Sequence, residues 1–320
     1  MWRVEIVTEK ENVTQTHHDV RKVRALFNPR SGLWWNRQGV QNILEGIWDI
    51  PGIDLTYQIS RNREDGIEKA KRAVEDGVDT IIVVGGDGMV NTIGGTLINT
   101  KTALAVIPAG SGNGFARHFN IPLSPEKAAK VLKIGHRMKI DVGFAAGRPF
   151  FVTCGLAWDA ELTRGFNESP IRGIIPYVFA GISGYFRYIP QNFKLLLDGA
   201  PRQVEKPMLF TVANLTQYGG GAMIAPDARP DDGYLVLVIV PYMDPVYLLS
   251  QVRRLFDGTI SEASNVTMQR FKKLEVFRER PDPIQADGEL LPVEKDFTIE
   301  VHPAALEVIV PEFWKLNPEK

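Results

Sequence analysis

Short apolar runs alternate with amphipathic stretches in the first part of the chain. The runs are rich in β-branched and other apolar residues and lie at 22–27, 53–60, 79–84 and 102–108. Between the second and third runs, Ile67, Ala70 and Val74 fall on one face of a helix, while charged residues fall on the other face. Strands that alternate with covering helices in this way predict a parallel sheet in an α/β lobe.

A further helix ends this region, and a different pattern follows it. Ser124 is expected as the N-cap of the helix and Pro125 as its first residue, and Gly135 lies just past its end. Beyond residue 138 the chain consists of short strand-like runs bounded by Gly, Pro or Asp, with helical stretches at 159–188 and 244–258. This pattern predicts a β-sandwich or barrel with helical insertions.

The chain is therefore expected to fold as two lobes, which also suits its length of 320 residues. An N-terminal extension at 1–21 precedes an α/β lobe at 22–138 and a β-sandwich lobe at 139–303. The last apolar run lies within 304–320 and fits either lobe. The pattern leaves open whether this segment returns to the first lobe.

Composition narrows the class of protein. Lys and Arg total 37 against 38 for Asp and Glu, so no global charge favours nucleic acid as a partner. The single Cys154 excludes an internal disulfide framework, and the N-terminus lacks the apolar core of a signal peptide. The longest apolar stretch, at 173–186, is shorter than the roughly 20 residues that a membrane-spanning helix needs. These features favour a globular protein of the cytoplasm.

Glycine-rich loops follow three of the predicted parallel strands, at 27–32, 85–88 and 108–117. Glycine lets backbone N–H groups approach a ligand closely, which is how many proteins hold phosphate. Because the carboxyl ends of parallel strands meet at one edge of a sheet, the loops are expected to converge on a single phosphate site. The loops lack the Walker pattern and the G-x-G-x-x-G turn, which disfavours P-loop and dinucleotide-binding proteins.

Acidic residues accompany these loops. Asp87 lies between glycines directly after a buried strand, where a bare carboxylate would repel phosphate unless it binds a divalent metal or accepts a proton from an attacking hydroxyl. Near the end of the chain, Asp287 and Glu289 flank Gly288, an arrangement that suits oxygen ligation of Mg²⁺. Taken alone, a hairpin turn at this Asp-Gly pair is the competing interpretation.

Five motifs in order carry a family resemblance: FNPRSG from residue 27, GGDG from 85, PAGSGNGFAR from 108, ANLTQYGGGAMIAPDARPDDGYLVLVIV from 213, and DGE from 287. Together they resemble the diacylglycerol kinase catalytic family, over about residues 22–310. The resemblance implies a nucleotide-binding lobe similar to those of phosphofructokinases and NAD kinases, a β-sandwich lobe for a lipid, and a cleft between them. It also implies ATP and Mg²⁺ as co-substrates and transfer of the γ-phosphoryl group of ATP to a lipid hydroxyl.

The resemblance assigns catalytic and nucleotide-binding residues by motif position. Asp87, Asp287 and Glu289 would be catalytic, and Glu289 would also bind metal. The nucleotide would be bound by Asn28, Ser31, Ser60, Gly85, Gly86, Gly88, Gly110, Ser111, Gly112 and Asn113.

The resemblance assigns two further sites in the second lobe. Asp159 matches a position that faces the lipid head group in sphingosine kinases. A structural metal would be bound by the side chain of Asp232 and the backbone carbonyls of Arg229 and Tyr234. An ordinary β-turn at 231–233 explains this last segment equally well.

The sequence departs from the family pattern after the second glycine loop. Members commonly have Thr and Glu where this chain has Met89 and Thr92. The missing carboxylate at Thr92 keeps open a nucleotide- or lipid-binding protein with weak or no turnover. NAD kinase shares the glycine-flanked Asp and is a second alternative, although the Asn-Glu signature of that family has no convincing match in this chain.

A membrane lipid is the implied partner, and no nucleic acid is expected. Residues 171–189 are rich in Ile, Phe and Tyr and are flanked by Arg172 and Arg187, a composition that suits peripheral contact with the inner face of a membrane or an acyl pocket. A helix packed on the sandwich is the alternative for this segment. Exposed strands would also allow a homodimer.

Overall fold

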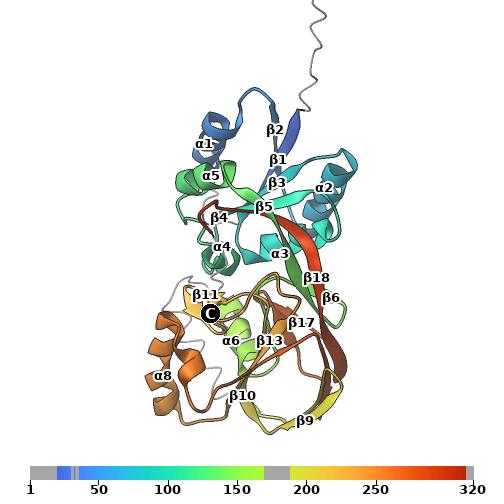
Figure 1. The fold of residues 1–320 in the computed structure, drawn as a ribbon, viewed down its shortest axis with the longest axis vertical. Coiled ribbons are helices and arrows are strands. Elements are labelled where there is room, and N and C mark those ends of the chain that lie inside the picture. The colour runs from blue at the N-terminus through green and yellow to red at the C-terminus, as the bar shows by residue number, and fades with distance from the viewer. Residues whose placement is uncertain (1–19, 30–31, 33–35, 169–187, 315–320) are drawn as a thin grey trace, which may run out of the picture.

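A computed structural model describes residues 20–29, 32, 36–168 and 188–314 of the chain. The chain forms two lobes, one built from the N-terminal half and the other mainly from the C-terminal half (Figure 1). Two strands, β5 and β18, run between the lobes in this view. The predicted fold class, an α/β lobe joined to a β-sandwich lobe with helical insertions, is confirmed.

The first lobe contains a parallel sheet with the strand order β2-β1-β3-β4. Every residue of β3 and β4 is buried, as expected of central parallel strands covered by helices on both faces. The strands are β1 (Arg21–Phe27), β2 (Ile53–Ile59), β3 (Thr80–Gly85) and β4 (Ala103–Pro108). The helices are α1 (Arg37–Trp48), α2 (Arg63–Glu75), α3 (Asp87–Leu97), α4 (Gly114–His118) and α5 (Pro125–Lys133). Ser124 is the N-cap of α5 as predicted, but its hydroxyl makes no capping hydrogen bond.

The second lobe packs an antiparallel sheet, in the order β14-β13-β10-β7-β16-β17, against the antiparallel part of the larger sheet. Phe193, Phe210 and Phe271 are fully buried between them. The strands of the second lobe are β6 (Arg148–Phe150), β7 (Thr153–Gly155), β8 (Phe193–Leu197), β9 (Ala200–Val204), β10 (Pro207–Ala213), β11 (Gln217–Gly219), β12 (Ala222–Met223), β13 (Leu235–Pro241), β14 (Thr267–Phe271), β15 (Lys273–Arg278), β16 (Ile284–Ala286) and β17 (Glu289–Leu291).

Strand β18 (Asp296–Val310) joins the two lobes into one sheet. It pairs antiparallel with β15 and with β5 (His136–Ala145), and then parallel with β4 through Val308 and Leu104. The register shifts between His302 and Leu306, where Ala304 has a φ of 50°, so a bulge divides the two halves of the strand. The end of β18 lies in the core of the first lobe, and the sequence boundary near residue 138 falls inside β5.

Two helices cover the outer face of the six-stranded sheet, α6 (Trp158–Glu168) and α8 (Pro245–Asp257). Trp158 and Leu162 of α6 pack there against Leu209 and Val238 in a second apolar layer. A short 3-10 helix, η2 (Ile260–Glu262), follows α8. The predicted contact segment 171–189 lies almost entirely outside the described residues. Within the described part of the chain, no helix is both long enough and apolar enough to cross a membrane.

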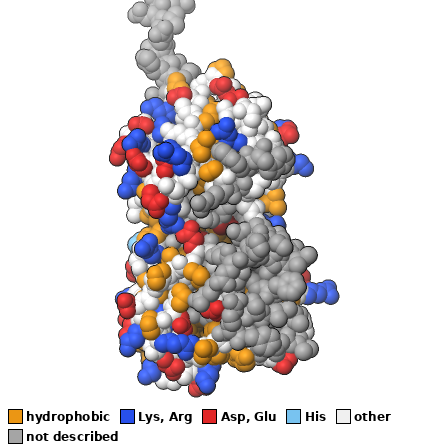
Figure 2. Space-filling view, turned by 180° about the vertical axis from the view of Figure 1, so that it is seen from behind, with side chains coloured by type: hydrophobic (Ala, Val, Ile, Leu, Met, Phe, Trp, Pro, Cys, Tyr) orange, Lys and Arg blue, Asp and Glu red, His pale blue; other side chains and the backbone are white. Residues whose placement is uncertain are grey.

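Acidic and basic side chains are interspersed over both lobes on the face shown in Figure 2. Neither lobe shows a broad area of a single charge sign on the visible described surface of this face. This distribution agrees with the balanced composition of the chain and offers no broad basic surface for a polyanion on that face.

Candidate functional site

The glycine loops after β3 and β4 touch each other through their backbones. A Cβ placed on Gly86 would lie 2.9 Å from the Cα of Gly110, and one placed on Gly110 would lie 2.6 Å from the Cα of Gly86. No side chain fits at either position without moving a backbone. The N–H of Gly32 also donates to the carbonyl of Ala109 at 2.9 Å. The three glycine-rich loops therefore meet at the carboxyl edge of the parallel sheet, as their sequence positions predict.

Asp87 belongs to the second glycine loop, and its carboxylate holds the third glycine loop in place. Its Oδ2 accepts the N–H of Gly114 at 2.9 Å and its Oδ1 accepts the N–H of Phe115 at 3.0 Å, at the start of α4. Burial raises the pKa of Asp87, and the amide hydrogen bonds oppose this shift. The N–H groups of Asp87 itself and of Asn113 also favour the ionised form of this carboxylate. Its assignment as a catalytic residue remains a prediction.

Asn113 holds the third loop in shape. Its φ of 50° is left-handed, its Oδ1 accepts the N–H of Gly110 at 2.8 Å, and its Nδ2 donates to the carbonyl of Gly110 at 2.7 Å. Its side chain is therefore occupied within the loop rather than presented to a ligand. Gly110 and Ser111 form the exposed tip of the loop, and Gly112 lies beside the carboxylate of Asp87. The groups that the loop offers to a nucleotide are mainly these residues and their backbone amides.

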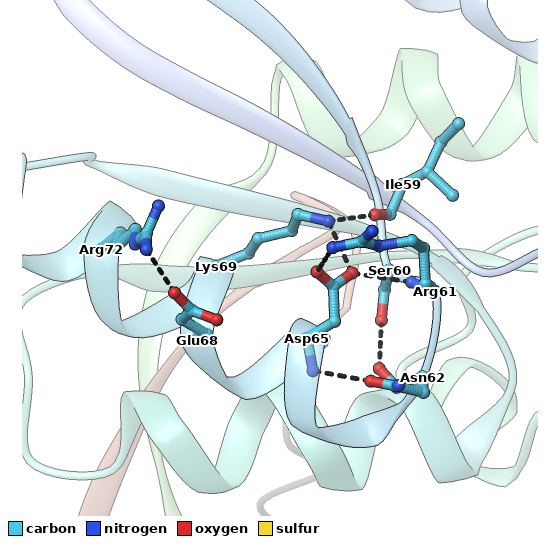
Figure 3. A network of polar contacts seen from close by, with 8 residues as sticks. All are labelled: Ile59, Ser60, Arg61, Asn62, Asp65, Glu68, Lys69 and Arg72. Atoms are coloured by element: carbon cyan, nitrogen blue, oxygen red, sulfur yellow. Dashed lines mark hydrogen bonds and ion pairs between the residues drawn. The ribbon is translucent and has the colours of Figure 1, made fainter.

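The turn between β2 and α2 is held by a network of hydrogen bonds. Figure 3 shows the Oγ of Ser60 donating to the carbonyl of Asn62, whose side chain in turn caps the N–H of Asp65 at 2.8 Å. Asp65 pairs with Arg61 and Lys69, and these hydrogen bonds hold the pKa of Asp65 well below its usual range. Ser60 is thus fixed at the carboxyl end of β2.

Two predicted nucleotide contacts belong to the first loop. The N–H of Asn28 donates to the carbonyl of Val84 at 3.2 Å, which places Asn28 beside the second loop. Ser60 lies next to it, because its N–H donates to the carbonyl of Phe27 at 2.9 Å. Ser31 lies outside the described residues.

Asp287 anchors the second lobe to the first. Its carboxylate accepts the N–H groups of Phe151, Val152 and Thr153 at 2.8 to 3.1 Å and the Nδ2 of Asn91 in α3 at 2.9 Å. It lies in the hairpin between β16 and β17 with a φ of 49°. Burial raises the pKa of Asp287 to about 6 despite these donors, and the charge of Asp87 contributes to the rise.

Glu289 reaches the glycine loop of the first lobe. A Cβ placed on Gly88 would lie 3.5 Å from Oε1 of Glu289, while Oε2 forms an ion pair with Nη1 of Arg63. Arg63 also approaches Oδ1 of Asn91 at 3.4 Å through Nη2. Asp287 and Glu289 therefore meet the first turn of α3, which begins at Asp87, although the chain separates them by most of its length.

A second glycine-rich hairpin approaches the site from the second lobe. Gly219, Gly220 and Gly221 all have positive φ angles, and the N–H of Gly220 donates to the carbonyl of Gly112 at 3.3 Å. The Nε of Arg117 donates to the same carbonyl at 3.1 Å. Sequence reasoning used this segment as a family motif and assigned it no role in the site. The run of three glycines in the sequence was the signal that could have placed this hairpin at the site.

Thr92, where the family commonly has Glu, lies one turn into α3. Its Oγ1 donates to the carbonyl of Gly88 at 2.9 Å. Its hydroxyl therefore bonds back to the first turn of its own helix and brings no charge to the loop.

Asp159 lies inside the second lobe with 1% of its surface exposed. Its Oδ1 accepts the N–H groups of Ala157 and Ala160, and its Oδ2 accepts the hydroxyl of Thr211 at 2.8 Å. Burial raises the pKa of Asp159 to about 7, against the lowering effect of these donors. The predicted contact with a lipid head group remains a prediction, and the described contacts of the carboxylate are internal.

We expect Asp159→Asn to flatten the pH dependence of stability. The folded carboxyl, with a pKa of about 7, retains a proton that the unfolded chain releases near its ordinary pKa of 3.8. Its contribution to stability is therefore fully present below about pH 4 and is lost as the pH rises towards 7. At pH 8 the variant should exceed the wild type by on the order of 2–4 kcal/mol in the free energy of unfolding, as measured with urea.

Asp54→Asn, at an exposed position on β2, is the control for this experiment and should leave the profile unchanged. Parallel profiles for Asp159→Asn and the wild type between pH 4 and 8 would show that the carboxyl is ionised throughout.

The residues predicted to bind a structural metal lie in one turn of the second lobe. The acidic residue among them, Asp232, forms an ion pair with Arg270. Oδ2 of Asp232 lies 2.7 Å from Nη2 of Arg270, and Oδ1 accepts the N–H of Tyr234 at 3.0 Å. Neighbouring Asp141 and Asp231 have raised pKa values, mainly through burial and partly through the charges of this acidic turn. Among the described residues, no group of three or more His, Cys, Asp or Glu side chains is arranged to hold a metal. A cation there would have to share Asp232 with Arg270, so this assignment, with Arg229 and Tyr234, remains a prediction.

Comparisons with known proteins agree with this architecture. Residues 22–145 match the family described as diacylglycerol kinase catalytic domain, and residues 152–310 match the YegS C-terminal NAD kinase beta sandwich-like domain. A diacylglycerol kinase of Mycobacterium tuberculosis is 30% identical over 305 residues, which cover 92% of this chain and 96% of that protein. A protein of Chromohalobacter salexigens named "Probable lipid kinase YegS-like" is 28% identical over 82% of this chain and 85% of its own length.

A solved structure shares the fold. The crystal structure of a diacylglycerol kinase from Bacillus anthracis str. Sterne superposes with a TM-score of 0.70 at 21% identity, over 92% of this chain and 98% of that one. With both lobes matched in order and a relative aligned along nearly the full length of each chain, the protein belongs to the diacylglycerol kinase catalytic family, a family of lipid kinases.

Proposed function

We propose that the protein transfers the γ-phosphoryl group of ATP to the hydroxyl of a lipid, either a diacylglycerol-like or a sphingoid one. The observation that carries this proposal is the meeting of glycine loops from the first lobe with acidic residues from the second. Gly88 lies against Glu289, and α3, which begins at Asp87, is bonded to Asp287 through Asn91. Backbone amides suited to phosphate thus lie beside carboxylates suited to a cation and a proton.

The reaction needs little covalent chemistry from the protein. The bond from the γ-phosphorus to the bridging oxygen of ATP breaks, a bond to the lipid oxygen forms, and ADP leaves. The proton of the lipid hydroxyl passes to a carboxylate, for which Asp87 is the first candidate and Asp287 the second. The amides of the second and third loops would hold the phosphates in place.

Mg²⁺ would neutralise charge on the phosphates, and Glu289 is the residue that suits it best. Of the three predicted catalytic carboxylates, Asp87 and Asp287 are bonded to backbone amides, whereas Glu289 has a half-exposed side chain and a side-chain partner. Mg²⁺ commonly binds one or two carboxylates together with substrate phosphates, so a carboxylate that is held only by the Arg63 side chain and lies beside a phosphate loop fits this ion.

The lipid would bind on the second lobe, with the protein at the inner face of the membrane in the cytoplasm. The proposed peripheral contact through 171–189 concerns residues that lie almost entirely outside the described part.

A panel of acceptors tests the proposal directly. Radiolabelled ATP would be supplied with diacylglycerol, phosphatidylglycerol, sphingosine, ceramide or NAD. We expect label on one of the lipids. Label on NAD alone would establish NAD kinase instead. Tight ATP binding with no labelled acceptor would favour a binding protein with weak or no turnover, the alternative that Thr92 raises.

We expect Thr92→Glu to reduce the Mg²⁺ concentration that gives half-maximal activity, by roughly threefold to tenfold. The new carboxylate would lie one helical turn from Gly88, on the side of the loop that Glu289 approaches. Thr96→Glu, one turn further along α3, is the matched control, because Thr96 makes the same kind of bond to the carbonyl of Thr92. Identical Mg²⁺ titrations for both variants would mean that position 92 takes no part in binding the ion.

A further inference from the structure

A small cavity of ≈ 70 Å³ lies between the lobes beside the first turn of α3. Its polar lining comes from Arg63 of α2, Asn91 of α3, Arg148 of β6 and Glu289 of β17. A cavity of this size holds a few water molecules, which suits a small oxyanion.

The charged groups of this cavity do not balance. Arg63 and Arg148 each carry a positive charge, and Glu289 supplies a single negative one. Arg63 forms an ion pair with Glu289, whereas the guanidinium of Arg148, an exposed residue, has no hydrogen-bond or ion-pair partner among the described residues. Thr92, on the adjacent turn of α3, adds no carboxylate. The side chains that line the cavity therefore carry an excess of one positive charge that can attract an anion, and the buried carboxylate of Asp287 lies behind them, bonded to Asn91.

The cavity adjoins the glycine loop through Glu289. Oε1 of Glu289 lies 3.5 Å from the Cβ position of Gly88, while its Oε2 bonds to Arg63. The Glu289 carboxylate thus lies between the glycine loop and Arg63, and the terminal group of a ligand that extends from the loop towards the second lobe can reach Arg63 once this ion pair opens. Guanidinium binds phosphoryl oxygens in the same forked geometry with which it binds a carboxylate.

We propose that Arg63 and Arg148 form a subsite for the terminal phosphoryl group of the nucleotide. Arg63 exchanges its bond with Glu289 for bonds to the phosphoryl oxygens, and the exchange leaves the Glu289 carboxylate free for Mg²⁺. Arg148 supplies a second charge from the other lobe. This subsite rests on the proposed function for the identity of its ligand but not for its preference for a phosphoryl anion.

Inorganic phosphate tests the anion site without nucleotide or lipid. Thermal unfolding would be followed against phosphate and against chloride at equal ionic strength, for the wild type, Arg63→Ala, Arg148→Ala and Arg72→Ala. Arg72 lies on the same helix and pairs only with Glu68 among the described residues, so it is the matched control. We expect phosphate to stabilise the wild type and Arg72→Ala, with at least fivefold more phosphate needed for either of the other variants. An equal response from all four proteins would refute the subsite.

Binding titrations with ATP and ADP test whether the two arginines bind the terminal phosphoryl group of ATP. Arg63→Ala and Arg148→Ala should weaken ATP binding about tenfold and leave ADP binding within about twofold, since each variant removes charge-assisted hydrogen bonds to the terminal phosphoryl group alone. Arg63→Lys keeps the positive charge but loses the forked guanidinium, so its affinity for ATP should lie between those of the wild type and Arg63→Ala. An equal loss of both nucleotides would place the arginines elsewhere along the phosphate chain and overturn the proposal.

The product lipid is the other source of a phosphoryl group. A short-chain phosphatidic acid that competes with ATP only when both arginines are present would show that the subsite also accepts the product. If the acid competes equally well in the arginine variants, and these variants still lose affinity for ATP but not for ADP, the subsite binds the nucleotide alone. If no acceptor in the kinase panel is labelled but the arginines still discriminate ATP from ADP, the proposed function fails and the subsite stands. If a lipid is labelled but the arginines do not discriminate ATP from ADP, the subsite fails and the proposed function stands.

Discussion

Asp87→Asn should reduce lipid phosphorylation by at least about 10³-fold in a protein that remains folded. Both oxygens of Asp87 accept backbone N–H groups, from Gly114 and Phe115. A carboxamide would turn its NH₂ towards one of these donors and leave that N–H unpaired, and it would also remove the negative charge. The variant therefore damages both proposed roles of this residue, as a proton acceptor and as the organiser of the third loop.

Equilibrium binding of ATP separates the two roles. Loss of a proton acceptor alone lowers kcat and leaves ATP affinity unchanged, whereas loosening of the loop weakens ATP binding as well. From the two amide bonds we expect a loss of affinity of about tenfold in addition to the kinetic defect.

Asp79→Asn is the control for the Asp87 variant. Asp79 also accepts a backbone N–H, from Lys22 at 2.8 Å, but it lies at the opposite end of β3. It should retain nearly full activity. Activity near that of the wild type in Asp87→Asn would remove Asp87 from the mechanism.

The strands and glycine loops of the first lobe were predictable because they depend on the burial and the steric limits of a few neighbouring residues. β3 and β4 are buried on both faces, so their sequences are unbroken apolar runs. The close approach of Gly86 to Gly110 admits no side chain, so the sequence must have glycine there. The strand ends and the loops that follow them can therefore be recognised without knowledge of the rest of the chain.

The long strand β18 was not predictable, because Pro303 resembles a strand terminator. The sequence suggested separate runs on either side of this residue. In the structure Pro303 lies in the bulge between His302 and Leu306, where the ladder is interrupted and a missing N–H is tolerated. A proline signal thus marks a bend in one strand that serves both lobes.

In the site, sequence identified the carboxylates but not their partners. The bond between Asn91 and Asp287 spans 196 residues and the pair of Arg63 and Glu289 spans 226, so no local spacing encodes either. The donors from Phe151 to Thr153 are backbone groups and have no side-chain signature. For this reason the pattern could not tell that Asp287 is almost wholly occupied in joining the lobes, whereas Glu289 is not.

Asp287→Ala is expected to destabilise the protein by about 4 kcal/mol or more. The change leaves three backbone N–H groups without this acceptor and removes one of the two acceptors of the Asn91 amide, and unsatisfied buried donors cost roughly 1–3 kcal/mol each, although such costs are not additive. Alanine also has to adopt a φ of 49°, which Asp and Asn tolerate better. The free energy of unfolding in urea at pH 7 measures the loss.

Asp198→Ala is a closely matched comparison for this variant. Asp198 also has a φ of 49° and accepts the N–H groups of Lys272 and Lys273, but it does so in an exposed hairpin of the second lobe alone. Water can replace the acceptor there, so the loss should be much smaller. Asp287→Asn keeps the left-handed turn and part of the hydrogen bonding, and it should lie between the two. If Asp287→Ala were as stable as Asp198→Ala and yet inactive, Asp287 would act in the chemistry rather than in holding the acidic hairpin against α3.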